Sequence, residues 1–149
     1  AYYITNDGNR IKELRLPSTH DKIRKQILFF NPILHPSVLI RKKMIDEIGN
    51  YDEKLVSAED YELWCRAISK GFKFYNIPEF LIELRGYSKS ATRGDGWKIH
   101  RKYVHMVQKL ALKKYGFQKP LDIIYYVIGS LILLISPKTE KIIKSILRI

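Results

Sequence analysis

The chain has 149 residues, 46% of them hydrophobic and 28% charged, and it carries a formal net charge of +12. This length and hydrophobic content fit one globular domain and exclude an intrinsically disordered chain. The chain has one cysteine, Cys65, which excludes an internal disulfide and is typical of a reducing compartment.

Turn residues and apolar spacing predict a series of short elements up to residue 85. The turn Asn6-Asp7-Gly8-Asn9 is a hairpin signal, and apolar residues at positions 23, 27 and 30 follow helical spacing. Gly49 and Gly71 are typical helix ends. In chain order we expect a hairpin over residues 2–16, a helix that begins at Ser18 or Thr19 and includes Phe30, a strand over 37–40, a helix over 41–48, a helix over 59–70, and strands over 72–76 and 80–85.

The helix over 59–70 begins with an acidic pair, Glu59 and Asp60. Ser57 stands at an N-cap position, and Asp60, three residues later, stands where a capping-box acid would be. A carboxylate in the first turn is held by local geometry and kept ionised by the helix dipole. A general base and an ordinary helix cap both need these properties, so the pattern leaves the two roles open, and they are compatible.

Four sequence pieces follow one another between residues 25 and 92. They are His35-Pro36-Ser37-Val38-Leu39-Ile40-Arg41-Lys42, then Ile48-Gly49-Asn50-Tyr51-Asp52-Glu53, then Ala58-Glu59-Asp60-Tyr61-Glu62-Leu63-Trp64 with Arg66, and last the stretch 71–79 with Leu84-Arg85. In this order and spacing they resemble the C-terminal half of the catalytic domain of family 2 glycosyltransferases, which have the GT-A fold. The resemblance implies an α/β fold: the acceptor-binding part of a GT-A-type, Rossmann-like domain over residues 1–96, followed by C-terminal helices.

The same resemblance implies roles for individual residues. Asp60 is expected to be the general base that deprotonates the acceptor hydroxyl. The other implied positions are Glu59, Tyr61, Trp64 and His35 at the acceptor, and Arg85 and Arg93 at the donor diphosphate. Core packing is the alternative for the two aromatic residues, and an ordinary surface position is the alternative for the two arginines.

Parts of that family's catalytic domain are missing from this sequence. No Asp-x-Asp motif occurs, nor the nucleotide-binding units that precede it, so we expect a piece of a longer enzyme that is inactive alone. The full-length enzyme is expected to use Mn²⁺ or Mg²⁺, although Tyr87 stands where the family has a His that helps to hold the metal, and no metal ligand is assigned in this chain. The signature Gln-x-x-Arg-Trp of processive enzymes is absent, which favours transfer of single sugars. The resemblance itself implies an inverting, nucleotide-sugar-dependent enzyme.

The C-terminal third is basic and helical in pattern. A long helix is predicted over residues 97–119, followed by a tail over 120–149 that joins an apolar segment, 121–135, to a basic amphipathic segment, 138–149. Residues 98–149 hold 11 Lys/Arg and 2 Asp/Glu, against 16 and 13 in residues 1–97. The tail predicts attachment to an anionic membrane surface, with packing on protein as the alternative.

Two function classes follow from the sequence. The first is a glycosyltransferase that acts on a cell-surface glycan or glycolipid precursor, placed in the cytoplasm on the inner face of the cell membrane. The second is a non-catalytic basic module that binds a membrane or nucleic acid. No RNA-reading motif is present, which disfavours nucleic acid as a partner. The sequence leaves the oligomeric state open, with a homo-oligomer as one alternative.

Overall fold

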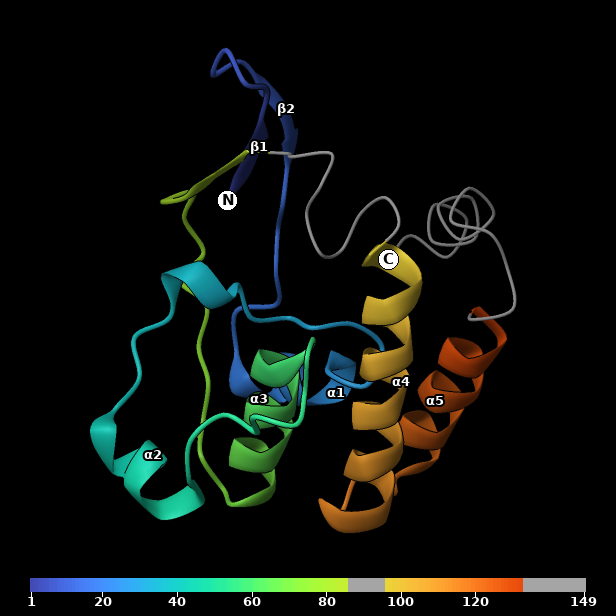
Figure 1. Cartoon of the computed structure of the whole chain (residues 1–149). Helices are drawn as coiled ribbons and strands as arrows, with labels where there is room; N and C mark the ends of the chain where they lie inside the picture. Colours follow the sequence, from blue (N-terminus) through green and yellow to red (C-terminus); the bar gives the residue numbers. More distant parts are fainter. Residues whose placement is uncertain (86–95, 133–149) are drawn as a thin grey trace.

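The computed structural model describes residues 1–85 and 96–132, and these residues form a mixed α/β arrangement. A small sheet lies at one end of the molecule, and the helices gather beside it (Figure 1). The elements are β1 (Tyr2–Ile4), β2 (Arg10–Glu13), α1 (His20–Gln26), the 3₁₀ helix η1 (His35–Ser37), α2 (Lys42–Ile48), α3 (Glu59–Ser69), β3 (Glu83–Arg85), α4 (Gly96–Lys114) and α5 (Pro120–Ile132). The mixed α/β class is therefore confirmed, while the GT-A arrangement stays a prediction.

The sheet has the strand order β2-β1-β3. The predicted hairpin is present: β1 and β2 pair antiparallel, and the turn between them is closed by the Gly8 N–H, which donates to the Thr5 carbonyl at 3.1 Å. β3 pairs parallel with β1, with Tyr2 opposite Glu83. The strand predicted over 80–85 is thus only three residues long, and Phe80 instead stacks on the Tyr2 ring at 4.4 Å between centroids.

Two predicted strands are wrong. Residues 37–40 do not form a strand, because Pro36 and Ser37 belong to η1, where the Ser37 hydroxyl donates to the Leu34 carbonyl at 2.8 Å. Residues 72–76 are not in a strand either. The Asn76 backbone N–H donates to the Ser18 carbonyl at 2.9 Å, and its side-chain amide donates to the carbonyls of Pro17 and Pro32, at 2.7 and 2.9 Å. These bonds hold residue 76 to other segments without forming a strand ladder.

Two expectations about helix ends are also corrected. α1 ends at Gln26 rather than including Phe30, and Pro32, which disfavours helix in the residue before it, follows closely. Ser57 does not cap α3: the N-cap residue is Ala58, and no side-chain cap hydrogen bond is present there. The capping box predicted for Ser57 and Asp60 is therefore wrong.

The core is centred on α3. Its Tyr61, Leu63, Trp64 and Cys65 are at most 1% exposed, and they pack with Ile23 and other residues of the α1 region. Burial raises the pKa of the Cys65 thiol, so this group stays protonated and unreactive as a nucleophile. The remaining buried hydrophobic residues of this cluster are Ile27, Leu28, Ile33, Met44, Ala58, Ala67, Ile68, Val107, Ala111 and Phe117.

Helices α4 and α5 lie side by side at one flank of the molecule (Figure 1). α4 ends at Lys114, five residues before the end of the helix predicted over 97–119, and α5 covers the start of the predicted tail. α5 is joined to α1 by a bidentate ion pair: the Arg24 guanidinium donates to both oxygens of Asp122, at 3.0 and 3.2 Å. The segment predicted to be basic and amphipathic, 138–149, lies outside the described residues.

Candidate functional site

The acidic pair stands in the first turn of α3, directly after Ala58, which has a strained backbone conformation. Ala58 has φ 64° and ψ 23°, and it is the one non-glycine residue with a positive φ in the part of the chain that the structure describes. A left-handed conformation costs a residue with a Cβ about 1 kcal/mol or more. The surrounding packing maintains this conformation, since Ala58 is 3% exposed. The backbone therefore turns sharply into Glu59 and Asp60.

Neutral donors hold the Asp60 carboxylate in place. The Asn31 side-chain amide donates to Oδ2 at 2.9 Å, and the backbone N–H of Tyr61 donates to Oδ1 at 2.7 Å. Asp60 is half-buried. A carboxylate offers about four acceptor sites, so these two bonds leave room for a further hydroxyl. The described contacts fix the orientation of Asp60 without placing a cation on it.

A tyrosine and a histidine border the acidic pair. Burial raises the pKa of Tyr51, and the carboxylates of Asp60 and Glu59 raise it further. The Tyr51 hydroxyl lies 3.0 Å from His35 Nε2, and His35 is exposed. The structure therefore brings His35 to the acidic end of α3 through Tyr51, a residue to which the sequence reasoning gave no role.

The start of α4 supplies a second histidine. His100 Nδ1 lies 2.8 Å from the Ser57 hydroxyl. Burial lowers the pKa of His100, the nearby Asp60 and Glu59 carboxylates oppose this shift, and Arg101 adds to it. His100 is thus mainly neutral at pH 7, and its ring sits within the electrostatic reach of the acidic pair. Ser57, expected to cap α3, instead joins α3 to α4.

An arginine on α3 fixes the turn that carries Tyr51. The Arg66 guanidinium donates to the backbone carbonyls of Ile48, Gly49 and Asn50. It also pairs with Glu62 one turn earlier, at 2.9 Å. Two of the sequence pieces noted above, the Ile48-to-Glu53 turn and the start of α3, are therefore one structural unit.

The two aromatic residues expected at the acceptor lie in the core. Tyr61 is 1% exposed, and its hydroxyl donates to the Ile27 carbonyl at 2.6 Å, which favours the packing alternative for this residue. Trp64 is also 1% exposed. Its ring lies edge-on to His35, with 6.1 Å between centroids, so it packs against the histidine from the core side.

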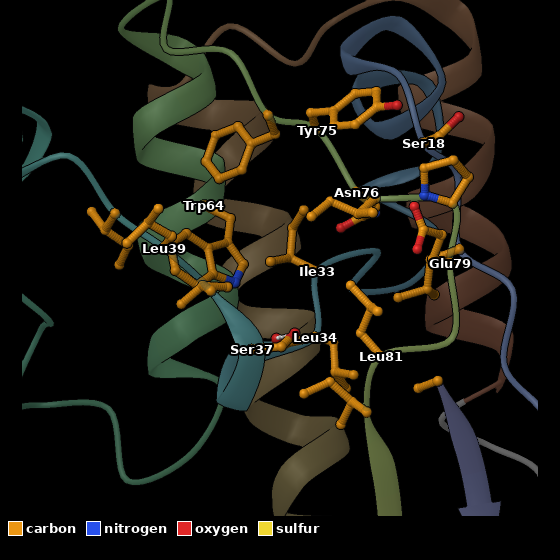
Figure 2. Close-up of a pocket in the computed structure, with 18 of the residues that line it drawn as sticks. Ser18, Ile33, Leu34, Ser37, Leu39, Trp64, Tyr75, Asn76, Glu79 and Leu81 are labelled. Carbon is orange, nitrogen blue, oxygen red and sulfur yellow. Dashed lines mark hydrogen bonds between the residues drawn. The ribbon is translucent and has the colours of Figure 1, made fainter.

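A cavity lies away from the acidic pair. This cavity, of about 690 Å³, opens between residues 33–41 and 72–82, and its walls are mainly apolar. Figure 2 shows Trp64 at one side of this cavity, with Ile33 and Leu81 bordering the same space. Trp64 Nε1 is buried and has no hydrogen-bond partner in the described part of the chain. Neither Glu59 nor Asp60 lines this cavity, so it is not a pocket around the acidic pair.

The two arginines expected at a diphosphate are not brought to the acidic pair by any described contact. Arg85, at the end of β3, donates to the Asn6 carbonyl in the hairpin turn at 2.5 Å. Arg93 and Tyr87 lie outside the described residues. In residues 1–85 and 96–132 no group of three or more His, Cys, Asp and Glu side chains is arranged to hold a metal ion.

Comparison with known proteins gives three relatives. The chain is 35% identical over 86 residues to an uncharacterized glycosyltransferase of Methanocaldococcus jannaschii, a match that covers 57% of this chain and 29% of the relative. It is 35% identical over 104 residues to the amylovoran biosynthesis glycosyltransferase AmsE of Erwinia amylovora, with 69% and 39% covered. It is 33% identical over 92 residues to the O-antigen biosynthesis glycosyltransferase WbnJ of Escherichia coli, with 60% and 35% covered.

These three matches support a relationship to glycosyltransferases. The chain spans between 29% and 39% of the length of these curated relatives. No protein-family profile matches the chain, and no solved structure matches it.

Four residues near the acidic pair were missed by sequence reasoning: Asn31, Tyr51, Ser57 as a partner of His100, and His100 itself. Asn31 is 29 positions from Asp60, and Ser57 is 43 positions from His100. Helical and strand periodicities relate residues only a few positions apart, so no spacing rule connects these pairs. Tyr51 had a signal, because it belongs to one of the four sequence pieces.

Proposed function

We propose that this chain carries the acceptor side of an inverting glycosyltransferase of the GT-A fold, family 2. The enzyme transfers one sugar from a nucleotide-sugar to a hydroxyl of a cell-surface glycan or glycolipid precursor. The observation that carries the proposal is Asp60, which is oriented by Asn31 and by its own helix at the start of α3. The similarity to three glycosyltransferases gives it independent support.

In this proposal Asp60 takes the proton of the acceptor hydroxyl as the acceptor oxygen attacks the anomeric carbon of the donor. The new carbon–oxygen bond forms while the bond to the nucleoside diphosphate breaks, and the bonding electrons leave with the diphosphate. Glu59 and His35 border the acceptor, and Trp64 supports the His35 ring from the core. Arg85 and Arg93 remain proposed contacts of the diphosphate.

We propose that the full-length enzyme uses a Mn²⁺ or Mg²⁺ ion and that this chain supplies none of its ligands. We also propose that the 149 residues alone neither bind nor turn over a nucleotide-sugar, and micromolar binding in calorimetry would contradict this.

A donor screen on the full-length protein, read out by nucleotide release, tests the activity. With the donor that gives nucleotide release, Asp60→Asn should lower the single-turnover rate by roughly 10²- to 10⁴-fold, because asparagine accepts no proton. Donor binding should stay intact. Glu59→Gln is the matched control and should have the milder effect. An Asp60→Asn enzyme within about threefold of wild type would remove the general base from the proposal, since a base contributes far more than that.

The alternative, a non-catalytic basic module, makes the opposite prediction for this experiment. A purely structural Asp60 would tolerate the change without loss of function, because the amide oxygen of asparagine can still accept a hydrogen bond from Asn31 or from the Tyr61 N–H. No nucleotide release with any donor, in a protein that is folded by circular dichroism, would favour this alternative.

A further inference from the structure

Helix α5 presents an apolar face to solvent. A water-facing helix face normally carries polar side chains, and the apolar stripe points toward the core. On α5 the distribution is reversed, since its acidic residue is buried and its aliphatic residues are outside. The exposed residues, each between 40% and 59% exposed, are Leu121, Ile123, Ile124, Val127 and Leu131. We call this set the α5 face.

The orientation of this face is fixed by contacts on the opposite side of the helix. The side chain of Asp122 is 3% exposed and is held by both terminal nitrogens of Arg24. Tyr125 packs against Phe29, and the Tyr126 ring stacks on His105 with 4.7 Å between centroids. Residues 122, 125 and 126 share one side of a helix with 3.6 residues per turn, so the α5 face must point outward.

Lysines of α4 border the α5 face. His105 forms the seam between the two helices, and Lys102 and Lys109, three positions before it and four after it, share its side of α4. Both lysines are exposed, as is Lys113 one turn beyond Lys109. Since α4 turns Val107 and Ala111 toward the core, these lysines lie on the solvent side of the seam.

Basic residues outnumber acidic residues in α4, α5 and the turn between them. Residues 98–132 contain seven Lys/Arg and a single acidic residue, Asp122. That acid is neutralised by Arg24, a residue of α1. The surface of these two helices therefore combines an exposed aliphatic patch with an excess of basic over acidic residues.

We propose that the α5 face and the bordering lysines of α4 are a docking surface for an anionic lipid bilayer. The aliphatic side chains enter the boundary between headgroups and acyl chains, and the lysines contact lipid phosphates. Nucleic acid fits less well, because the exposed residues of α5 are aliphatic and offer no ring for base stacking. The centre of a protein–protein interface is usually depleted in lysine.

The helix lies along the surface in this proposal. The 13 described residues of α5 span about 20 Å at 1.5 Å per residue, shorter than the roughly 30 Å hydrocarbon core. No helix within the described ranges is long and apolar enough to cross a membrane. The proposal does not rest on the glycosyltransferase activity, because vesicle binding is measured without any sugar donor.

Co-sedimentation of the full chain with vesicles tests the proposal. Wild type should bind vesicles that contain phosphatidylglycerol, and bind pure phosphatidylcholine vesicles far less. The variant Ile124→Gln/Val127→Gln/Leu131→Gln should lower the partition coefficient by about tenfold or more. The variant Lys102→Gln/Lys109→Gln should lower it by about fivefold per charge at low salt, and by less at high salt.

Matched controls separate this surface from general stickiness and net charge. Ile11→Gln and Val56→Gln remove residues that are 64% and 80% exposed on other parts of the molecule. Lys42→Gln/Lys43→Gln removes the same number of charges from α2, where both lysines are highly exposed. All three controls should bind like wild type, and all variants should keep the urea midpoint of wild type, since only exposed side chains change.

Three results would overturn the proposal. The first is unchanged vesicle binding by both α5-face and α4 variants. The second is loss of binding only when Lys138, Lys141, Lys144 and Arg148 of the tail are changed to Gln. The third is self-association of wild type in sedimentation velocity that the triple variant abolishes, without an effect on vesicles; this result would assign the face to a second copy of the chain.

Discussion

Helices α3 and α5 place their acidic and apolar side chains in opposite ways. α3 buries its apolar residues almost completely and carries the Glu59-Asp60 pair at its open end. α5 buries its acidic residue and leaves its aliphatic residues in solvent. The first distribution is that of a core helix with an acidic first turn. The second is that of a helix whose outer face has no apolar surface packed against it among the described residues.

The two aspartates have different kinds of hydrogen-bond donors, which suit different roles. Asp122 faces a bidentate guanidinium, which neutralises it and fixes a helix in position. The described donors to Asp60 are an amide and a backbone N–H, which orient the carboxylate and leave its charge in place. The kind of donor, more than the depth of burial, separates a structural carboxylate from a candidate base.

The largest effect on stability should come from breaking the α5 anchor. Asp122→Asn leaves the mostly buried Arg24 without its counter-charge and should lower the free energy of unfolding by about 3 kcal/mol. Urea unfolding of the 149-residue chain, followed by circular dichroism, measures this. The double variant Arg24→Met/Asp122→Leu is the control, and it should recover much of the loss because no buried charge stays unpaired. Equal stability of Asp122→Asn and wild type would show that the pair does not hold α5.

The corresponding change on α3 should cost less. Glu62 is buried, accepts from Arg66, and accepts from the Tyr115 hydroxyl at 2.5 Å. Glu62→Gln removes the charge, but Arg66 keeps its bonds to backbone carbonyls of residues 48–50, so we expect a loss of about 2 kcal/mol. A loss larger than that of Asp122→Asn in the same urea experiment would reverse the comparison.

A smaller effect is expected at the turn that Arg66 holds. Gly49 has φ 84° and ψ 171°, a backbone conformation that is essentially restricted to glycine. Gly49→Ala should therefore cost about 1–3 kcal/mol in the free energy of unfolding. Alanine replacement of the exposed Lys54, beyond the same turn, serves as the control and should be nearly neutral. A fully stable Gly49→Ala chain would mean that this turn relaxes without strain.

The smallest predicted effect concerns pH and the open end of α3. Burial lowers the pKa of His100 in the folded chain, so the folded state binds a proton there less readily than the unfolded state. This contribution to stability is fully present above about pH 6.5, the unfolded value, and is lost as the pH falls through the lower folded-state pKa. His100→Gln should therefore lose less stability than wild type when the pH falls from about 7.5 to about 5.5, two values on either side of the unfolded-state pKa. Parallel pH profiles of the two urea midpoints would contradict the assignment.

Local signals predicted the elements that are stabilised locally. The hairpin was readable from Asn6 to Asn9, α2 from Gly49, and α3 from its acidic start and its apolar spacing. The strands predicted over 37–40 and 72–76 failed for a physical reason. A strand needs a hydrogen-bonded neighbouring strand. Ser37 lies in a 3₁₀ turn in which its hydroxyl bonds to the Leu34 carbonyl, and Asn76 makes isolated backbone and side-chain bonds to Ser18 and Pro17.

The site was predictable only in part. Glu59 and Asp60 were found because they are adjacent in sequence and the surrounding pieces resemble a known family. Their neighbours Asn31 and His100 come from other parts of the chain, and sequence periodicity says nothing about such pairs. The N-cap failed because Ser57 contacts His100 in place of the helix backbone, a competition that only the tertiary structure decides.

The Arg24–Asp122 pair also has a consequence for the order in which the chain is made and folded. The two residues are 98 positions apart, so at synthesis rates of about 5–20 residues per second Arg24 is made roughly 5 to 20 seconds before Asp122. Phe117, whose ring lies 3.8 Å from the Arg24 guanidinium, arrives almost as late. Throughout that interval the growing chain carries an unmatched cation and an uncovered patch of α1 where α5 will dock. The docking of α5 is therefore a late event of biosynthesis, and the α5 face takes up its fixed direction only at that moment.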